Sequence, residues 1–182
     1  MSDGSRIYNI DPAHTSVEFV VRHLMIAKVR GRFTGLSGTV TLPAEGHIPT
    51  AVEATIDTTT VATGEPQRDT HLRSGDFLET ETHPTMTFKS TKITETGDGF
   101  DLQGDLTLHG VTKAVELKAT YEGATTDPWG NARYGYEAHG KISRKDFGLV
   151  WNMALEAGGV TVGDEVKIEL SVEAVAPAAV QA

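Results

Sequence analysis

Alternation of apolar and polar residues dominates the chain and predicts β-strands. Within 16–23, for example, every second residue from Val17 to His23 falls on one face. Clean alternation over such lengths is typical of antiparallel strands that bury one face. The clearest strands are expected at 16–23, 38–42, 51–57, 85–93, 99–110, 114–123 and 165–175, and weaker ones at 6–11, 27–36 and 134–142.

Turn-forming residues separate these strands. TGDG (96–99) predicts a hairpin turn, and TTDPWGN (125–131) predicts a longer loop or hairpin tip. The glycine-rich stretch GRFTGLSG (31–38) predicts a bent strand or a bulge. We therefore expect an all-β chain of eight or nine strands. The alternation fits a closed barrel and a sandwich equally well, since both give each strand one apolar face.

One segment departs from the alternation and predicts a short helix. TGEPQRDTHLRSG (63–75) offers Thr63 as an N-cap, a proline in the first turn and Gly75 as a stop. At the C-terminal end of the chain, residues 176–182 are expected to be a frayed tail. The organisation expected is one domain over residues 1–182.

Composition narrows the function classes. The chain has 182 residues and a net charge of −9, which disfavours binding to nucleic acid, because that needs clustered Lys and Arg. The absence of cysteine excludes disulfides, thiolate catalysis and Cys-ligated zinc. The N-terminal residues lack the pattern of a signal peptide, and no apolar run has the length of a membrane span, so a cytoplasmic protein is expected.

The stretch QRDTHLRSGDFLE (67–79) gathers basic and acidic side chains around a histidine, which is the material of acid–base chemistry. Asp69 and His71 are two positions apart, however, and do not share a helix face. We interpret Arg68, Asp69 and His71 as a structural polar corner that fastens the helix across one end of the sheet.

Metal and nucleophile motifs are missing. The seven histidines lie at 14, 23, 47, 71, 83, 109 and 139, and no two are within five positions of each other. No metal site and no enzyme activity are therefore expected. One alternative stays open, a metal-assisted enzyme that draws His14, His71 and His109 from separate strands.

Two apolar segments do not alternate. These are HLMIAKV (23–29) and DFGLVWNMALEAGG (146–159), and Trp129 lies in a loop. They fit core-capping and lid packing, or an adaptable apolar mouth above a cavity, where methionine and aromatic residues suit a flexible ligand. The pattern leaves both interpretations open.

Five motifs in order along the chain resemble the YceI-like family of bacterial polyisoprenoid-binding proteins. The matching stretches are YNIDPAHTSVEFVVRHLMIAKVRGRFTGLSG (8–38), RDTHLRSGDFLE (68–79), HPTMTFKST (83–91), GDLTLHGVTKAVEL (104–117) and SRKDFGL (143–149).

The resemblance implies an extended antiparallel lipocalin-like β-barrel of about eight strands with one short helix. It also implies that the interior binds a long-chain isoprenoid-type amphiphile, a polyprenyl phosphate or an isoprenoid quinone, for transport, storage or sequestration. Relatives are also linked to other lipids and hydrophobic small molecules, many are exported, and the family suggests a homodimer. No cofactor is implied beyond the bound lipid.

Parity along the strands and the family barrel together predict the ligand-binding residues. Arg30, Arg144 or Lys145 would face a polar head group, although a surface salt bridge is the expected role of each. A further alternative is a protein-interaction barrel filled by its own side chains. The predicted cavity wall comprises Phe19, Val21, His23, Phe33, Phe88, Leu106 and Tyr136, and the predicted mouth comprises Met25, Phe77, Trp129, Phe147, Trp151 and Met153.

Overall fold

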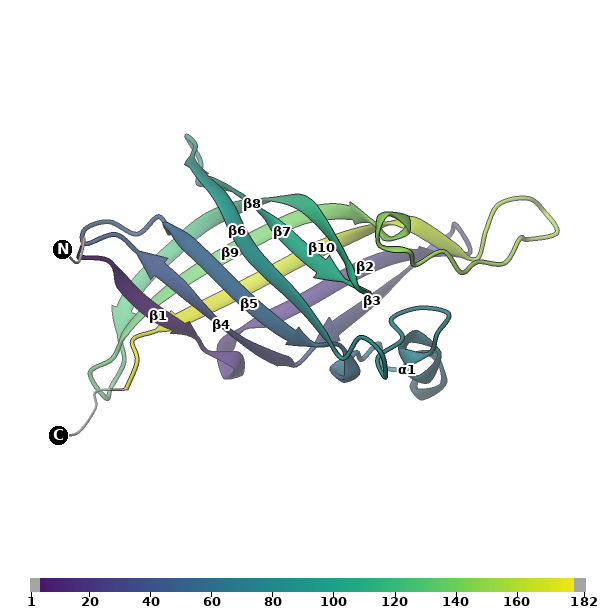
Figure 1. Cartoon of the computed structure of the whole chain (residues 1–182), viewed down its shortest axis with the longest axis horizontal. Coiled ribbons are helices and arrows are strands. Elements are labelled where there is room, and N and C mark those ends of the chain that lie inside the picture. Colours follow the sequence, from purple (N-terminus) through teal and green to yellow (C-terminus); the bar gives the residue numbers. More distant parts are fainter. Residues whose placement is uncertain (1–3, 179–182) are drawn as a thin grey trace.

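The computed structural model describes residues 4–178, which form one antiparallel sheet of ten strands with a single α-helix (Figure 1). The helix α1 spans Pro66–Arg73, and the short 3-10 helices are η1 (Pro12–His14), η2 (Thr58–Thr60) and η3 (Arg144–Phe147). The strands are β1 (Arg6–Ile10), β2 (Ser16–His23), β3 (Ala27–Phe33), β4 (Gly35–Leu42), β5 (Ala51–Asp57), β6 (Thr85–Glu95), β7 (Phe100–Leu108), β8 (Val111–Thr126), β9 (Ala132–Ser143) and β10 (Val162–Val175).

The sheet closes on itself through β10. That strand pairs with β9 along one edge, and along the other it pairs with β1 and then with β2. β3 and β4 are separated only by Thr34, which is the bend expected within 31–38. β1 and β2 lie one after the other along the same edge of β10, and β3 continues into β4. Each of these two pairs occupies one strand position, so the ten strands form a closed antiparallel barrel of eight. The predicted all-β barrel is confirmed.

The helix begins later than the sequence suggested. Its N-cap is Glu65, whose carboxylate accepts hydrogen bonds from the backbone N–H groups of Gln67 and Arg68, so the assignment of Thr63 as the N-cap was wrong. A bridge between Arg32 and Ala62 holds the segment before α1 against the edge of β3. The helix therefore lies beside one end of the barrel (Figure 1). Within residues 4–178, no helix has the length and apolar character needed to cross a bilayer.

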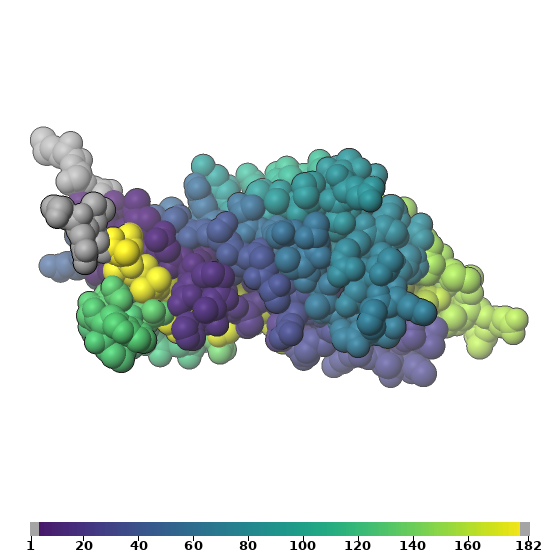
Figure 2. Space-filling model, turned by 90° about the horizontal axis from the view of Figure 1, so that it is seen from below, coloured from purple at the N-terminus to yellow at the C-terminus, as the bar shows by residue number. Residues whose placement is uncertain are grey.

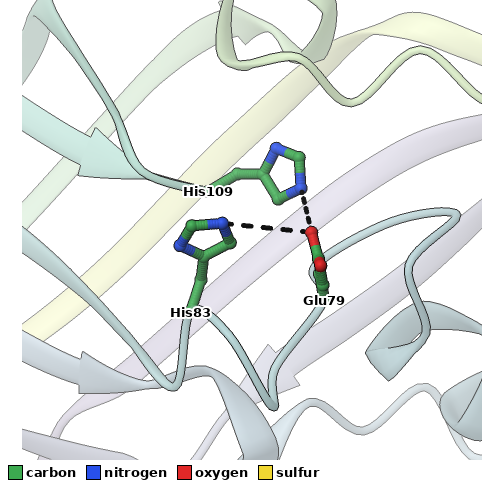
Figure 3. A group of neighbouring side chains, drawn as sticks. All are labelled: Glu79, His83 and His109. Carbon is green, nitrogen blue, oxygen red and sulfur yellow. Dashed lines mark ion pairs between the residues drawn. The ribbon is translucent and has the colours of Figure 1, made fainter.

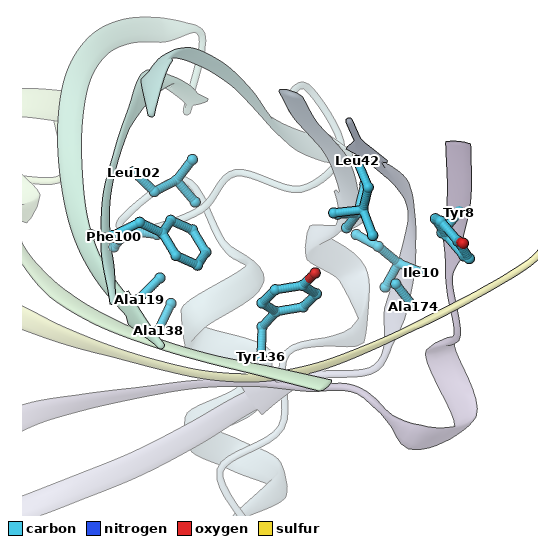
Figure 4. Close-up of a cluster of buried hydrophobic side chains, with 11 residues drawn as sticks. Tyr8, Ile10, Leu42, Phe100, Leu102, Ala119, Tyr136, Ala138 and Ala174 are labelled. Carbon is cyan, nitrogen blue, oxygen red and sulfur yellow. The ribbon is translucent and has the colours of Figure 1, made fainter. Parts of the chain in front are cut away.

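The opposite end of the barrel is filled by side chains. Leu42 and Ala174 are fully buried there, and Tyr8 packs beside them (Figure 4). The Tyr136 hydroxyl donates to the His47 carbonyl at 2.7 Å, which ties the loop between β4 and β5 over this end. We call this the closed end. The part of the predicted tail at 179–182 lies outside the described residues.

An ion-pair network fastens the closed end. The guanidinium of Arg133 on β9 donates to the carboxylates of Asp11, Asp127 and Glu173. Arg133, with a smaller contribution from His14, lowers the pKa of the Asp11 carboxyl to about 2. Burial would raise the pKa of Asp127, but hydrogen bonds from Asn131 and Arg133 lower it below its ordinary value.

This network predicts a defined acid sensitivity. Carboxylates with a depressed native pKa stabilise the fold above their ordinary pKa of about 4, and the contribution is lost as the pH falls toward about 2. Arg133→Met should therefore destabilise the protein at neutral pH and destabilise it less near pH 2, since the Asp11 carboxyl is then about half protonated. Urea unfolding of both proteins at the two pH values measures this. The control is Arg30→Met, which breaks exposed ion pairs. An equal loss of stability at both pH values for Arg133→Met would contradict the assignment.

Candidate functional site: an apolar cavity in the barrel

The barrel encloses a cavity of about 590 Å³. Every strand contributes inward-facing residues to its wall. Additional lining residues come from α1 and from the segment after it. Aliphatic and aromatic side chains make up most of the wall, as the alternation of the strands requires. This volume lies within the roughly 300–1,000 Å³ of cavities that enclose small-molecule ligands.

Small residues keep the bore open. Ala119 on β8 lies directly opposite Ala138 on β9, and both side chains face the cavity. Their methyl groups leave space that larger side chains would fill.

Two glycines shape the wall in another way. A methyl group at Gly31 would overlap the ring of Phe19, and one at Gly104 would overlap the ring of Phe88. Both phenylalanine rings therefore lie across a neighbouring glycine and still line the cavity. This arrangement gives the wall aromatic surface without filling the bore.

The mouth lies at the end that carries α1. Among the lining residues, those classed as exposed are Arg22 and His23 at the end of β2 and Glu65 and Gln67 at the start of the helix. The lining residues of the closed end, such as Val40, are buried. The cavity therefore opens to solvent between the end of β2 and α1.

Three aromatic side chains pack together just inside this mouth. The ring of His71 lies 5.0 Å from that of Phe77 and 4.8 Å from that of Trp151, and the Phe77 and Trp151 rings are 5.2 Å apart. All three line the cavity. Beyond them, the loop between η3 and β10 projects from this end of the molecule (Figure 2).

The structure brings most of the predicted site residues to the cavity. Met25 and Met153 are exposed on the loops around the mouth. Trp129 lies on the β8–β9 hairpin at the closed end, 81% exposed, and Phe147 is buried behind cavity-lining residues such as Leu106 and Leu149. These four do not line the cavity, whereas the lining includes Phe19, Val21, His23, Phe33, Phe77, Phe88, Leu106, Tyr136 and Trp151.

The polar corner is organised around Thr63 and Asp76. Arg68 donates to the hydroxyl and carbonyl oxygens of Thr63, and the carboxylate of Asp69 accepts from the Thr63 N–H and hydroxyl. His71 bonds to Asp76 at 2.8 Å and does not pair with Asp69. Arg68 and His71 also line the cavity.

The spacing of residues along α1 could have indicated which of its side chains line the cavity. Arg68, His71 and Leu72 are at positions i, i+3 and i+4 of α1, and all three face the cavity. Sequence reasoning assigned the first two to a structural corner and left Leu72 out, as it left out Arg22, Glu65 and Gln67 at the mouth.

The three basic residues considered for a head group have other partners. Arg30 pairs with Glu18 and Glu169, and Lys145 pairs with Asp164 at 3.0 Å; both are exposed. Arg144 differs from its expected role at the surface, because its side chain is only 4% exposed. Burial lowers the pKa of Arg144, and its guanidinium donates to backbone carbonyls around the mouth.

The histidines of the enzyme alternative do not come together. His14 bonds to Asp11, His71 bonds to Asp76, and His109 lies against Glu79. In residues 4–178, His14 and His109 belong to two different groups of potential ligands, and His71 belongs to neither. No observation therefore favours a shared site for these three.

Comparison with known proteins gives consistent matches. Residues 8–174 match the model of the family described as the YceI-like domain. The chain is 43% identical over 170 residues to protein YceI of an Escherichia coli strain, covering 92% of this chain and 86% of that protein.

Solved structures share the barrel. The YceI protein of Campylobacter jejuni superposes with a TM-score of 0.72 at 28% identity, covering 86% of this chain and 90% of that one. A polyisoprenoid binding domain from Saccharophagus degradans, implicated in plant cell wall breakdown, superposes with a TM-score of 0.64 at 19% identity, covering 93% of this chain and 98% of that one.

Proposed function

Because this chain belongs to the YceI-like domain family, we propose that its barrel binds a long-chain isoprenoid-type amphiphile, such as a polyprenyl phosphate or an isoprenoid quinone. The observation that carries the proposal is the apolar cavity, which is closed by side chains at one end and open at the other. Such a tube accepts the end of a slender apolar chain and leaves a polar head at the mouth.

The energetics favour this class of ligand. Each buried CH₂-sized group contributes about 0.8 kcal/mol, so a long chain outweighs the cost of association, which is several kcal/mol. Charged contacts within the cavity are not needed. At the mouth, Arg22 and His23 are exposed lining residues and are placed to contact a polar head group.

The Saccharophagus degradans domain, which is named for polyisoprenoid binding, supports the ligand class through its shared barrel fold. For this chain we propose a binding protein that transports, stores or sequesters such a ligand and is not an enzyme. Assembly as a homodimer and a cytoplasmic location stay predictions.

Native mass spectrometry of freshly purified protein, followed by organic extraction and lipid analysis, tests the proposal. We expect one bound amphiphile per chain, with a mass series spaced by isoprene units. If none copurifies, added isoprenoid quinone or polyprenyl phosphate should bind at one per barrel. Failure to copurify and to take up either added ligand would contradict the proposal, and copurification of a different lipid would replace the isoprenoid with that lipid class.

A further inference from the structure

Two loops near the mouth end bring a carboxylate and two imidazoles together outside the cavity (Figure 3). Glu79 and His83 lie in the segment between α1 and β6, and His109 lies in the turn between β7 and β8. Glu79 Oε2 lies 3.4 Å from His109 Nε2 and 3.9 Å from His83 Nε2. One potential ligand atom from each residue lies within 4.8 Å of the others.

His109 is held with one ring nitrogen free. Its Nδ1 donates to the Phe147 carbonyl at 3.0 Å, which leaves Nε2 with its lone pair in the neutral ring. Nε2 is buried and has no hydrogen-bond partner. Histidines that bind metals commonly donate the other ring N–H to a backbone carbonyl in this way.

The backbone at His109 has a positive φ, which few residues other than glycine adopt. His109 and Gly110 have φ values of 53° and 72° and form the two-residue turn between paired strands. Both positions of such a turn need positive φ, which favours Asn-Gly. Asparagine is therefore the residue type that this turn position prefers, and the chain has a histidine there.

Glu79 and His83 are held by a tight turn of their own. The backbone N–H of His83 donates to the Glu79 carbonyl at 2.8 Å, and the Thr82 hydroxyl donates to Glu79 Oε1 at 3.1 Å. The other carboxylate oxygen, Oε2, is the one that faces the imidazoles. The His83 ring lies against Gly110, where a Cβ atom would be only 2.8 Å from Cε1.

The separations fit a shared ion better than direct hydrogen bonds. Hydrogen bonds between nitrogen and oxygen span about 2.7–3.2 Å, shorter than both contacts of Glu79. Two ligands at about 2.0–2.1 Å from a tetrahedral zinc ion lie about 3.3–3.4 Å apart. The Glu79–His109 separation of 3.4 Å matches that spacing, and the His83 contact of 3.9 Å needs a shift of about half an ångström.

The second group of this kind in residues 4–178 shows the contrast. Asp11, His14 and Glu173 also lie together, but Arg133 donates to both carboxylates and supplies the positive charge. Within the described residues, Glu79 Oε2 faces imidazole nitrogens, and the carboxylate forms no ion pair with a Lys or Arg. The Glu79 group therefore lacks the cation that its counterpart contains.

We propose that Glu79, His83 and His109 form a binding site for one divalent transition-metal ion of the zinc class. Two imidazoles and a carboxylate are a ligand set that zinc uses, with a fourth position left for water. Such an ion would join the segment before β6 to the β7–β8 turn. The neighbouring residues Leu78 and Leu108 line the cavity, so the ion would brace the wall beside the mouth.

Titration of chelator-treated protein with Co²⁺, followed by its visible absorption, tests the site directly. We expect one Co²⁺ per chain with the spectrum of a tetrahedral site, displaced by Zn²⁺. His109→Asn should weaken binding by about 100-fold and keep the turn, because asparagine suits positive φ. Glu79→Gln should weaken binding at least tenfold. His139→Asn, which changes an exposed histidine on β9, is the matched control and should bind as the parent protein does.

Absence of the Co²⁺ spectrum in the parent protein would overturn the proposal. So would equal affinity of the parent, His109→Asn and Glu79→Gln proteins, because the ion would then lie elsewhere. Should one variant fail to fold, the other still decides the outcome. The result is independent of lipid binding, since none of the three residues lines the cavity.

Discussion

Replacing Arg144 with methionine should lower the free energy of unfolding by about 3 kcal/mol. The guanidinium is almost fully buried and donates to the carbonyls of Leu149 and Trp151 in the loop and of Gly163 in β10. It is the cation that holds the loop after η3 to the start of β10. Methionine fills similar space but leaves these carbonyls without a donor. Urea unfolding of the two proteins gives the difference.

Lys145→Met is the matched control, because Lys145 is the next residue and pairs with the same carboxylate, Asp164. Lys145 is 53% exposed, and an exposed ion pair contributes about 0–1 kcal/mol. A loss for Arg144→Met no larger than the control loss would mean that water replaces the guanidinium at no cost. Because Trp151 lines the cavity, Arg144→Met should also weaken ligand retention, whereas Lys145→Met should not.

The strands could be predicted because burial in them follows the alternation of the sequence. On β7, Phe100, Leu102, Leu106 and Leu108 are all buried as their spacing requires. The closure of the barrel could not be predicted in this way. It depends on β1 and β2 sharing one edge of β10, which is a long-range pairing that no local pattern encodes.

In the candidate site too, residues on strands could be predicted from alternation and residues in loops could not. Residues on strands, such as Phe19 and Phe88, reach the cavity where parity placed them. Residues in segments without alternation have no parity, so nothing local distinguished Trp151, which lines the cavity, from Met153, which does not. Trp129 looked like a mouth residue because it is aromatic and in a loop, yet its hairpin lies at the closed end.

The histidine–carboxylate group was missed for a related reason. Searches for metal motifs rely on ligands spaced along one helix or strand, and His83 and His109 are far apart in sequence. Their proximity arises because the β7–β8 turn meets the segment before β6. The available signals were Glu79 four positions before His83, and a histidine where a tight turn prefers asparagine.

Replacing Ala138 with phenylalanine should reduce the amount of bound amphiphile at least tenfold and leave the fold intact. Ala138 faces the bore opposite Ala119, so a ring there would occupy the space that the proposed ligand needs. Loss of only a few buried CH₂ groups, at about 0.8 kcal/mol each, is enough for a tenfold change. The fold should survive, because the ring points into the cavity that Ala138 lines and its crowding against the buried cluster costs only about 1–3 kcal/mol.

Ala124→Phe is the matched control for that substitution. Ala124 lies on β8 like Ala119 but is exposed, so the added ring cannot enter the barrel. Extractable lipid per chain, measured for the three proteins after identical expression, separates a blocked bore from a general effect of an added aromatic. Unchanged lipid in Ala138→Phe would place the ligand outside the bore. Equal loss in both variants would mean a general effect of an added aromatic side chain and not a blocked bore.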